Sequence, residues 1–202
     1  MVHHPITLKT HTNTTEMLGP KNEPWQVELK DPAISVMTDF RLRAMFKIDI
    51  DETIDEALHK MKIAALRMAF VTEKGSENIL GAITSYDIMG EKPMRFLQSV
   101  GFSDRAITHK DIRVRDIMEP TKDWVVTEMQ NVDKVNVQSV LEALQKTGRT
   151  HIPVIECKEG ETPRLRGLFS ASMVLRLTEF SRQKIAKKLE SQSLPTQQAK
   201  GA

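Results

Sequence analysis

The sequence repeats itself: IDEALHKM at residues 54–61 returns as VQSVLEAL at residues 137–144 without a gap. In both segments the apolar residues fall at positions i, i+3, i+4 and i+7, which lie on one face of a helix. These residues are Ile54, Ala57, Leu58 and Met61 in the first segment and Val137, Val140, Leu141 and Leu144 in the second. Two equivalent helices are therefore predicted, each packed through one face on an apolar surface.

Two strands are predicted after each helix, in the same order. The first strand is MAFV at residues 68–71 in one copy and HIPVI at residues 151–155 in the other. A turn containing glycine follows, and then a second strand with glycine in its third place. The turn glycines are Gly75 and Gly160, and the second strands span residues 79–84 and 165–170, with Gly81 and Gly167. A lead-in containing methionine precedes each copy, SVMT at residues 35–38 and DIME at residues 116–119.

This order predicts an α+β fold made of two β-α-β-β-α repeats. A unit of this size buries little apolar surface alone, so the two repeats are expected to pack together as one pseudo-two-fold module. The predicted segments are an N-terminal arm, partly disordered, at residues 1–30, the first repeat at 31–92, a connector at 93–108, the second repeat at 109–180, and a basic C-terminal helix and tail at 181–202.

The composition excludes several classes of protein. The 29 Lys and Arg residues nearly balance the 27 Asp and Glu residues, so no field favours nucleic acid or an anionic membrane. The single cysteine, Cys157, forms no disulfide and no Cys-based zinc site within one chain. No apolar run is long enough to span a membrane, and the first residues lack the layout of a signal peptide. We expect a cytoplasmic protein without a metal site.

The repeated segments resemble the CBS domain, the module named after cystathionine β-synthase. The resemblance rests on VMTDF, IDEALHKM and GAITSYD in the first repeat and on DIMEP, SVLEAL, THIPVIE and GLFSASM in the second. It implies a cleft between the two repeats that holds an adenosyl ligand: AMP, ADP or ATP, with S-adenosylmethionine as an alternative. It also implies a homodimer of two modules, and a regulatory role toward a protein that the sequence does not name.

The segment GAITSYD, residues 81–87, has two interpretations that the residues alone leave open. Thr84 and Asp87 have the spacing of a capping box, in which Thr84 caps a helix and Asp87 is its third residue. As a binding site, the Asp87 carboxylate would accept hydrogen bonds from the ribose hydroxyls and Thr84 would orient the sugar. The second repeat keeps the cap at Ser170 but has Met173 in place of the acid, which argues against a second nucleotide site.

A basic segment before the second repeat's first strand is the candidate phosphate site. Arg149 and His151 lie where CBS domains often carry phosphate-binding residues, and we take Arg67 as the counterpart of Arg149 in the first repeat. The alternative is that Arg149 is a solvated surface charge and His151 an ordinary strand residue. Ile83, Met118 and Ser170 complete the set of candidate ligand-binding residues.

The function expected from these observations is a regulatory module that binds an adenine nucleotide. The alternative is a structural module for dimerisation whose ligand cleft is degenerate. No phosphate-binding glycine loop and no catalytic arrangement of Ser, His, Cys or acidic residues stands out, so we expect neither an enzyme nor a required cofactor.

Overall fold

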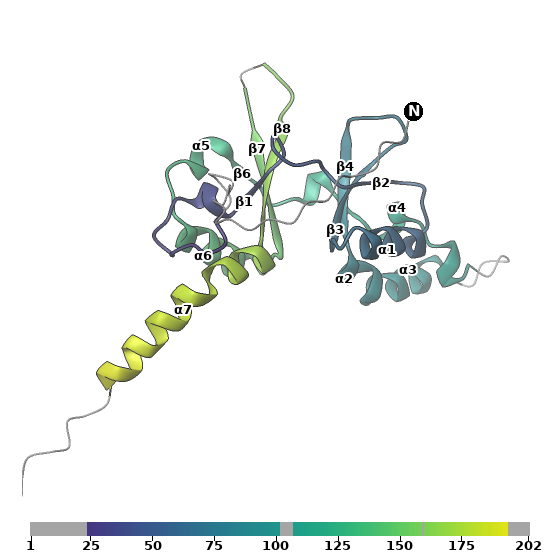
Figure 1. The fold of residues 1–202 in the computed structure, drawn as a ribbon. Coiled ribbons are helices and arrows are strands. Elements are labelled where there is room, and N and C mark those ends of the chain that lie inside the picture. Colours follow the sequence, from purple (N-terminus) through teal and green to yellow (C-terminus); the bar gives the residue numbers. More distant parts are fainter. Residues whose placement is uncertain (1–23, 102–106, 159, 194–202) are drawn as a thin grey trace, which may run out of the picture.

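The computed structural model describes residues 24–101, 107–158 and 160–193. The predicted α+β fold class is confirmed: two four-stranded sheets stand beside each other, each with helices packed against it (Figure 1). The first twenty-three residues of the expected arm, residues 102–106 of the expected connector, and the tail beyond residue 193 lie outside the described residues.

The two repeats have the same order of elements. The first repeat consists of β2 (Lys47–Asp49), α1 (Ile54–Ile63), β3 (Met68–Thr72), β4 (Ile79–Thr84) and α2 (Ser85–Met89), followed by α3 (Lys92–Val100). The second consists of β6 (Thr127–Glu128), α5 (Met129–Val132), α6 (Val137–Thr147), β7 (His151–Glu156), β8 (Arg164–Ser170) and α7 (Ala171–Ser193). The two lead-ins form the short helix η1 (Ala33–Val36) with β1 (Met37–Asp39), and η2 (His109–Asp111) with α4 (Val114–Ile117), β5 (Glu119–Pro120) and η3 (Thr121–Asp123).

The sheets repeat one another strand by strand. Their orders are β2-β3-β4-β5 and β6-β7-β8-β1, with the first pair parallel and the other two antiparallel in each sheet. Even the irregularity recurs, because the register shifts between Val71 and Thr72 in β3 and between Val154 and Ile155 in β7. The sequence repeat is therefore also a structural repeat.

Each lead-in strand belongs to the other repeat's sheet. Strand β1, which precedes the first repeat, pairs with β8, and Thr38 lies opposite Leu168. Strand β5, which precedes the second repeat, pairs with β4, and Glu119 lies opposite Ala82. We call the sheet β2–β5 with its helices and residues 107–120 the first body. The sheet containing β1, β6, β7 and β8, with its helices and residues 24–39, is the second body.

The residues that precede β1 and β5 also bind the opposite repeat, at the first turns of α1 and α6. The Ile54 N–H, at the start of α1, donates to the Ile112 carbonyl at 3.0 Å, and the Val137 N–H, at the start of α6, donates to the Asp31 carbonyl at 2.9 Å. Both donors lie in the first turn of a helix, where N–H groups lack a partner within the helix. Each lead-in thus provides a hydrogen-bond acceptor for an N–H group in the first turn of the other repeat's helix.

The glycine in third place of each second strand has a steric explanation in this exchange. A Cβ added at Gly81 would lie 2.4 Å from the Glu119 carbonyl oxygen in β5. A Cβ added at Gly167 would lie 2.8 Å from the Thr38 carbonyl oxygen and from the Met37 sulfur in β1. Any larger residue would push the exchanged strand away.

Each body has its own apolar core, and a third cluster joins them. The first core includes Ile54 and Met61 of α1 together with Ile112, Val114 and Ile117 of the lead-in. The second includes Val137 and Leu144 of α6 together with Val27, Ala33 and Val36 from the chain's other end. The joining cluster contains the buried residues Phe70, Ala82 and Leu168, which come from both sheets. The two bodies therefore share buried apolar surface, as expected for one module.

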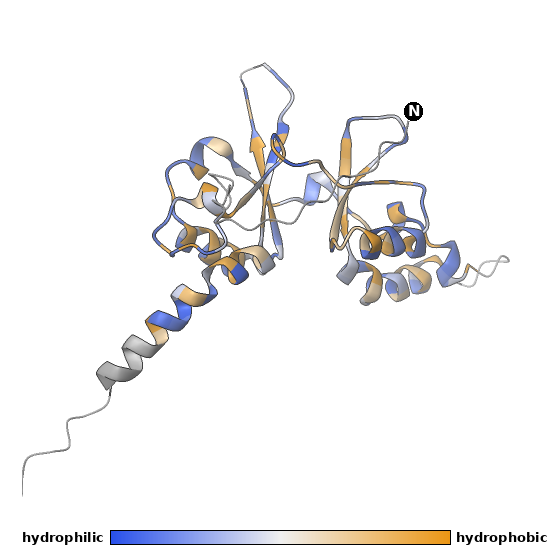
Figure 2. Cartoon of the chain, in the orientation of Figure 1, coloured by the Kyte–Doolittle hydropathy of each residue, from blue (hydrophilic) through white to orange (hydrophobic). Residues whose placement is uncertain are grey.

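Two segments expected to be irregular are ordered. The expected connector contains α3, which begins with Pro93 in its first turn and packs Phe96 and Leu97 on the first core. Residues 93, 96 and 97 have helical spacing, and proline is tolerated in a first turn. Figure 2 shows the corresponding mixture of hydrophilic and hydrophobic residues along α1 and α3. The end of the expected arm also packs: the Val27 side chain is buried, and its N–H donates to the Leu177 carbonyl at 2.9 Å.

Candidate functional site

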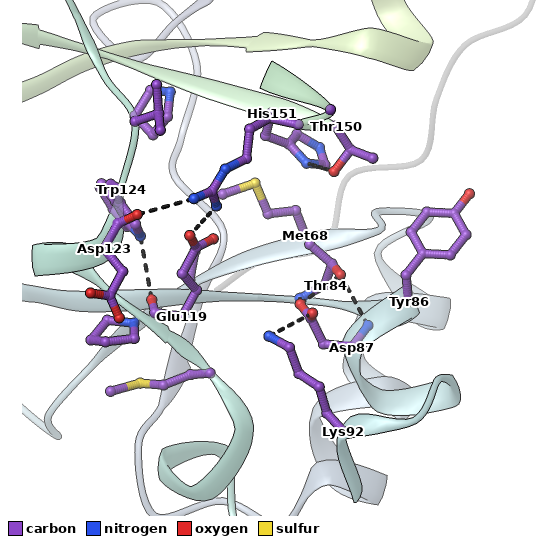
Figure 3. A pocket seen from close by; sticks show the side chains of 17 residues that line it. Met68, Thr84, Tyr86, Asp87, Lys92, Glu119, Asp123, Trp124, Thr150 and His151 are labelled. Atoms are coloured by element: carbon purple, nitrogen blue, oxygen red, sulfur yellow. Dashed lines mark hydrogen bonds and ion pairs between the residues drawn. The ribbon is translucent and has the colours of Figure 1, made fainter. Parts of the chain in front are cut away.

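A cavity of about 490 Å³ lies between the two bodies. The first body contributes the end of β4, the start of α2 and strand β5, and the second body contributes the residues that lead into β7. Figure 3 shows the side chains that line it. The cavity therefore exists only when the two repeats are packed together.

Thr84 and Asp87 form the predicted capping box at the cavity wall. The Asp87 Oδ2 atom accepts from the Thr84 N–H at 2.8 Å and from the Thr84 hydroxyl at 2.7 Å, and the Asp87 N–H donates to Thr84 Oγ1 at 3.1 Å. These bonds hold the carboxylate in place at the start of α2. The capping interpretation is thus realised, and the same two side chains line the cavity.

Lys92, at the start of α3, is the second partner of that carboxylate. Its ammonium lies 2.8 Å from Asp87 Oδ1 and donates to the Ile117 carbonyl at 3.2 Å. Both oxygens of Asp87 are therefore engaged, one by Thr84 and one by Lys92. Each carboxylate oxygen has two lone-pair sites, so Oδ1 keeps the capacity for a further donor.

Arg149 enters the cavity from the second body and binds the first. Its guanidinium forms an ion pair with Glu119 of β5 and donates to the Asp123 carbonyl at 3.2 Å (Figure 3). The Arg149 and Glu119 side chains are 34% and 30% exposed, so the pair is partly open to solvent. Arg149 thus lines the cavity as a cation whose charge is already paired with that of Glu119.

His151, the first residue of β7, lines the cavity two residues after Arg149 and has a different hydrogen-bond partner. Its Nδ1 atom is 3.0 Å from the Thr150 hydroxyl. Burial lowers the pKa of His151, and the negative charge of Asp87 acts in the opposite direction. At neutral pH the imidazole is therefore uncharged, and an anionic ligand beside it would raise its pKa.

An apolar wall completes the cavity. It includes Met68, Ala82, Pro153 and Trp124. The Trp124 ring packs on Phe70 with 5.9 Å between ring centroids, and its indole N–H donates to the Glu119 carbonyl at 3.3 Å. These contacts hold the Trp124 ring in place next to the charged groups, which suits a ligand with an aromatic ring and polar substituents.

The structure brings together most of the candidate ligand-binding residues. Thr84, Asp87, Met118, Arg149 and His151 all line the cavity. The remaining candidates lie elsewhere: Ile83 is fully buried in the first core, Arg67 is on the surface, and Ser170 lies in β8, where its hydroxyl is 3.0 Å from that of Ser172.

Arg67 is not the counterpart of Arg149, which corrects the expected equivalence. Met68 pairs with Thr84, and His151 pairs with Ser170, so Met68 and His151 are equivalent. Arg67 is therefore equivalent to Thr150, and Leu66 to Arg149. Arg67 instead donates to the Tyr86 hydroxyl at 2.8 Å and lies 6.0 Å from the centre of that ring.

Several residues that line the cavity were not among the predicted ligand-binding residues, including Lys92, Glu119, Asp123 and Trp124. Lys92 is the last residue of the predicted first repeat, and the predicted connector begins directly after it. Glu119 belongs to the quoted segment DIMEP, but nothing local predicts that its strand crosses to the other sheet. The signal that could have found Glu119 is the glycine at position 81, which its carbonyl requires.

Two searches of the described residues concern other classes of site. They contain no group of three or more His, Cys, Asp or Glu side chains placed to hold a metal ion. Among the helices of the described part of the chain, none is both long and apolar enough to cross a membrane.

Comparison with known protein families finds a match for the first repeat. The family model of the CBS domain matches residues 35–93. A search of curated protein sequences found no match to the chain. The family match confirms the resemblance for the first repeat, and the second repeat has the same topology.

Several solved structures are similar. An uncharacterised conserved protein from Pyrococcus horikoshii has a TM-score of 0.49 and 20% identity, covering 86% of this chain and 100% of that one. The CBS-pair protein CBSX2 from Arabidopsis thaliana has a TM-score of 0.46 and 18% identity, covering 78% and 96%. A structure of CBSX2 in complex with AMP has a TM-score of 0.48 and 18% identity, covering 78% and 98%.

Proposed function

We propose that this tandem CBS-domain protein, with a CBS domain at residues 35–93 and the same fold repeated in its second half, binds one adenine nucleotide per chain and thereby regulates a partner protein. One observation carries the proposal. The cavity between the bodies brings the Thr84–Asp87 pair of the first repeat together with Arg149 and His151 of the second.

The ribose role falls to Asp87 and Thr84. A ribose diol offers two hydroxyl donors, and an ionised carboxylate is an acceptor with capacity for several of them. The capping box fixes the Asp87 carboxylate before any ligand arrives, so little conformational freedom is lost on binding. The structural cap thus supports the binding role and does not compete with it.

The phosphate role falls to Arg149, with His151 beside it. Guanidinium binds a phosphate through two parallel hydrogen bonds, and the neutral imidazole can donate one more. Arg149 must share or release Glu119 to do so. Because Arg149 belongs to the second body and Glu119 to the first body's sheet, a bound phosphate changes a contact between the bodies. This gives the ligand a route to affect a partner.

Titration calorimetry on the wild type and Asp87→Asn tests the proposal. AMP, ADP, ATP and S-adenosylmethionine are titrated separately into the full chain. We expect a stoichiometry of one, and we expect Asp87→Asn to weaken binding roughly tenfold to a hundredfold, since a hydrogen bond to a charged group is worth about 1.5–3 kcal/mol.

Glu56→Gln is the matched control for this experiment. Glu56 occupies the same position in the capping box of α1, where it accepts from the Thr53 N–H at 2.9 Å, but it does not line the cavity. Both variants weaken a helix cap, and only Asp87→Asn removes the ribose acceptor. Equal affinity in wild type and Asp87→Asn would refute the ribose assignment. Absence of binding by all four compounds would favour the structural module with a degenerate cleft.

The homodimer remains a proposal that rests on the family resemblance. The first body offers a surface for a second copy, because Ile63, Tyr86, Met89 and Met94 on α1, α2 and α3 are more than half exposed. Light scattering at high micromolar concentration tests it, and a mass of one chain would refute it.

A further inference from the structure

We propose that the cavity selects among adenine nucleotides by charge, preferring the monophosphate to the triphosphate, and that Glu119 is the residue that sets this preference. The inference rests on the proposed function and names the ligand class within it. It follows from which ionisable groups line the cavity, which of them are already paired, and where they lie.

Acids outnumber bases in the cavity lining. The carboxylates are those of Asp87, Glu119 and Asp123, and the permanent cations are those of Lys92 and Arg149. Burial keeps His151 neutral near pH 7 by lowering its pKa. The lining therefore has one net negative charge, which is unusual for a site that would hold a highly charged polyphosphate.

Both cations are already committed to anionic partners. Lys92 contacts the Asp87 carboxylate at 2.8 Å and the Ile117 carbonyl at 3.2 Å. Arg149 pairs with the Glu119 carboxylate and the Asp123 carbonyl. A single phosphate group can compete with Glu119 for one guanidinium. For a second and a third phosphate, the only other permanent cation among the described residues that line this cavity is Lys92, which is paired with Asp87.

The arrangement of the acids adds repulsion to this shortage. Figure 3 shows Glu119 and Asp123 toward one side of the cavity and Asp87 with Lys92 toward the other. Arg149 contacts both Glu119 and the Asp123 carbonyl, so phosphates added beyond one bound to Arg149 would lie close to these two acids. Like charges at short range in a partly desolvated cavity repel more strongly than in water.

Glu119 contributes more than Asp123 to the preference for AMP over ATP, because the two acids contact Arg149 differently. It is paired directly with Arg149 and is partly buried, whereas Asp123 is exposed and contacts Arg149 only through its backbone. Removing the Glu119 charge both frees the guanidinium and removes a repelling carboxylate. Removing the Asp123 charge does only the second.

Calorimetry without divalent cations, at constant ionic strength, tests the proposal. AMP, ADP and ATP are titrated into the full chain as wild type, Glu119→Gln and Asp123→Asn. In the wild type we expect AMP to bind at least tenfold more tightly than ATP. Glu119→Gln should strengthen ATP binding about tenfold and AMP binding less, so that the ratio falls. Asp123→Asn should change the ratio in the same direction by a smaller factor.

Glu156→Gln is the matched control variant. Glu156 also pairs with an arginine, Arg41, at 2.7 Å, but neither residue lines the cavity. This variant should leave the ratio of AMP to ATP affinity unchanged. Thermal unfolding of each variant shows whether it is folded. If Glu119→Gln does not fold, Asp123→Asn still tests the proposal, because it changes an exposed side chain.

The outcomes separate this inference from the proposed function. Failure of AMP, ADP and ATP to bind any variant refutes both. Binding of AMP together with equal or tighter binding of ATP in the wild type refutes the selectivity alone, as does an unchanged ratio in Glu119→Gln and Asp123→Asn. A repeat with Mg²⁺ adds a further check. If Mg²⁺ makes ATP the preferred ligand and Glu119→Gln abolishes that gain, the carboxylates hold a metal ion and the inference is wrong.

Discussion

The two repeats place equivalent backbone around two very different sets of side chains. At the first position, the cavity described above, Thr84 and Asp87 line the same space as Arg149 from the other repeat. The equivalent residues at the second position are Ser170, Met173 and Leu66. The acid and the arginine are both replaced by apolar residues, while the capping hydroxyl remains. The fold is thus compatible with either set, and the ligand chemistry depends on a few side chains.

The second position uses its side chains for packing and for an ion pair that is mostly shielded from solvent. The Thr38 hydroxyl donates to the Met173 sulfur at 3.8 Å, and Met173 packs against the second core. Next to Thr38 in β1, Asp39 forms an ion pair with Arg166 of β8, with side chains 17% and 10% exposed. The comparable pair at the first position, Glu119 with Arg149, is more open. One position is therefore built for stability and the other keeps its charges accessible.

The largest expected effect comes from separating the repeats. A fragment of residues 31–92 lacks Ile112, Val114, Ile117 and β5, which complete the first core and sheet. We expect it to show no cooperative unfolding transition. A fragment of residues 44–120 contains the whole first body, and we expect it to unfold cooperatively. Circular dichroism during heating measures both, and a cooperative, monomeric 31–92 fragment would show that the exchange is dispensable.

The two ion pairs should differ clearly in their contribution to stability. Arg166→Met leaves the partly buried Asp39 carboxylate without its cation, which should cost about 1–3 kcal/mol of unfolding free energy. Arg149→Met breaks a pair that is about one-third exposed, and should cost about 1 kcal/mol or less. Urea unfolding at pH 7 measures both. Similar losses would show that the two positions are energetically alike.

The stability from Asp39 should also depend on pH. Burial acts to raise the pKa of Asp39, but hydrogen bonds from Arg166 and the Arg41 N–H hold it below its usual value overall. The folded state therefore binds its proton at lower pH than the unfolded state does. The contribution is present above about pH 4, the ordinary value for Asp, and is lost as the pH falls through the folded pKa.

The smallest expected effect comes from His151 at the first position. Because burial lowers its pKa in the folded state, the unfolded chain takes up a proton first as the pH falls below about 6.5. Stability should therefore decrease between pH 7.5 and pH 5.5, and His151→Gln should remove part of that decrease. Urea unfolding at both pH values measures this.

The sequence predicted the repeated elements because their signals are local. Apolar residues at helical spacing predicted α1 and α6, and the capping-box spacing predicted the start of α2. The exchange of β1 and β5 was not predictable in this way. These strands contain only three and two residues, and their partners lie far away in the sequence. Gly81 and Gly167 were visible as a repeated feature, but their reason is a steric contact that only the structure shows.

The candidate site was predictable in part for the same reason. Asp87 and Thr84 belong to a motif that can be seen in one segment, and they line the cavity. Lys92 and Glu119 act through contacts between segments that are not adjacent in sequence. The mistaken equivalence of Arg67 and Arg149 came from matching residue types, because the strand pairing makes Arg67 equivalent to Thr150, one position after Arg149.

The exchanged lead-ins also have a consequence for the order in which the chain can fold during synthesis. Residues 54–84 cannot complete their core until residues 112–120 have left the ribosome. Val27, Ala33 and Val36 must wait longer, because their core also contains Val174 and Leu177. At about 5–20 residues per second, the N-terminal lead-in remains without its partners for about 7–30 seconds. Such long-range closure slows folding. We therefore expect the first body to complete its folding once residue 120 is available, and the second body to do so only after most of the chain has been made.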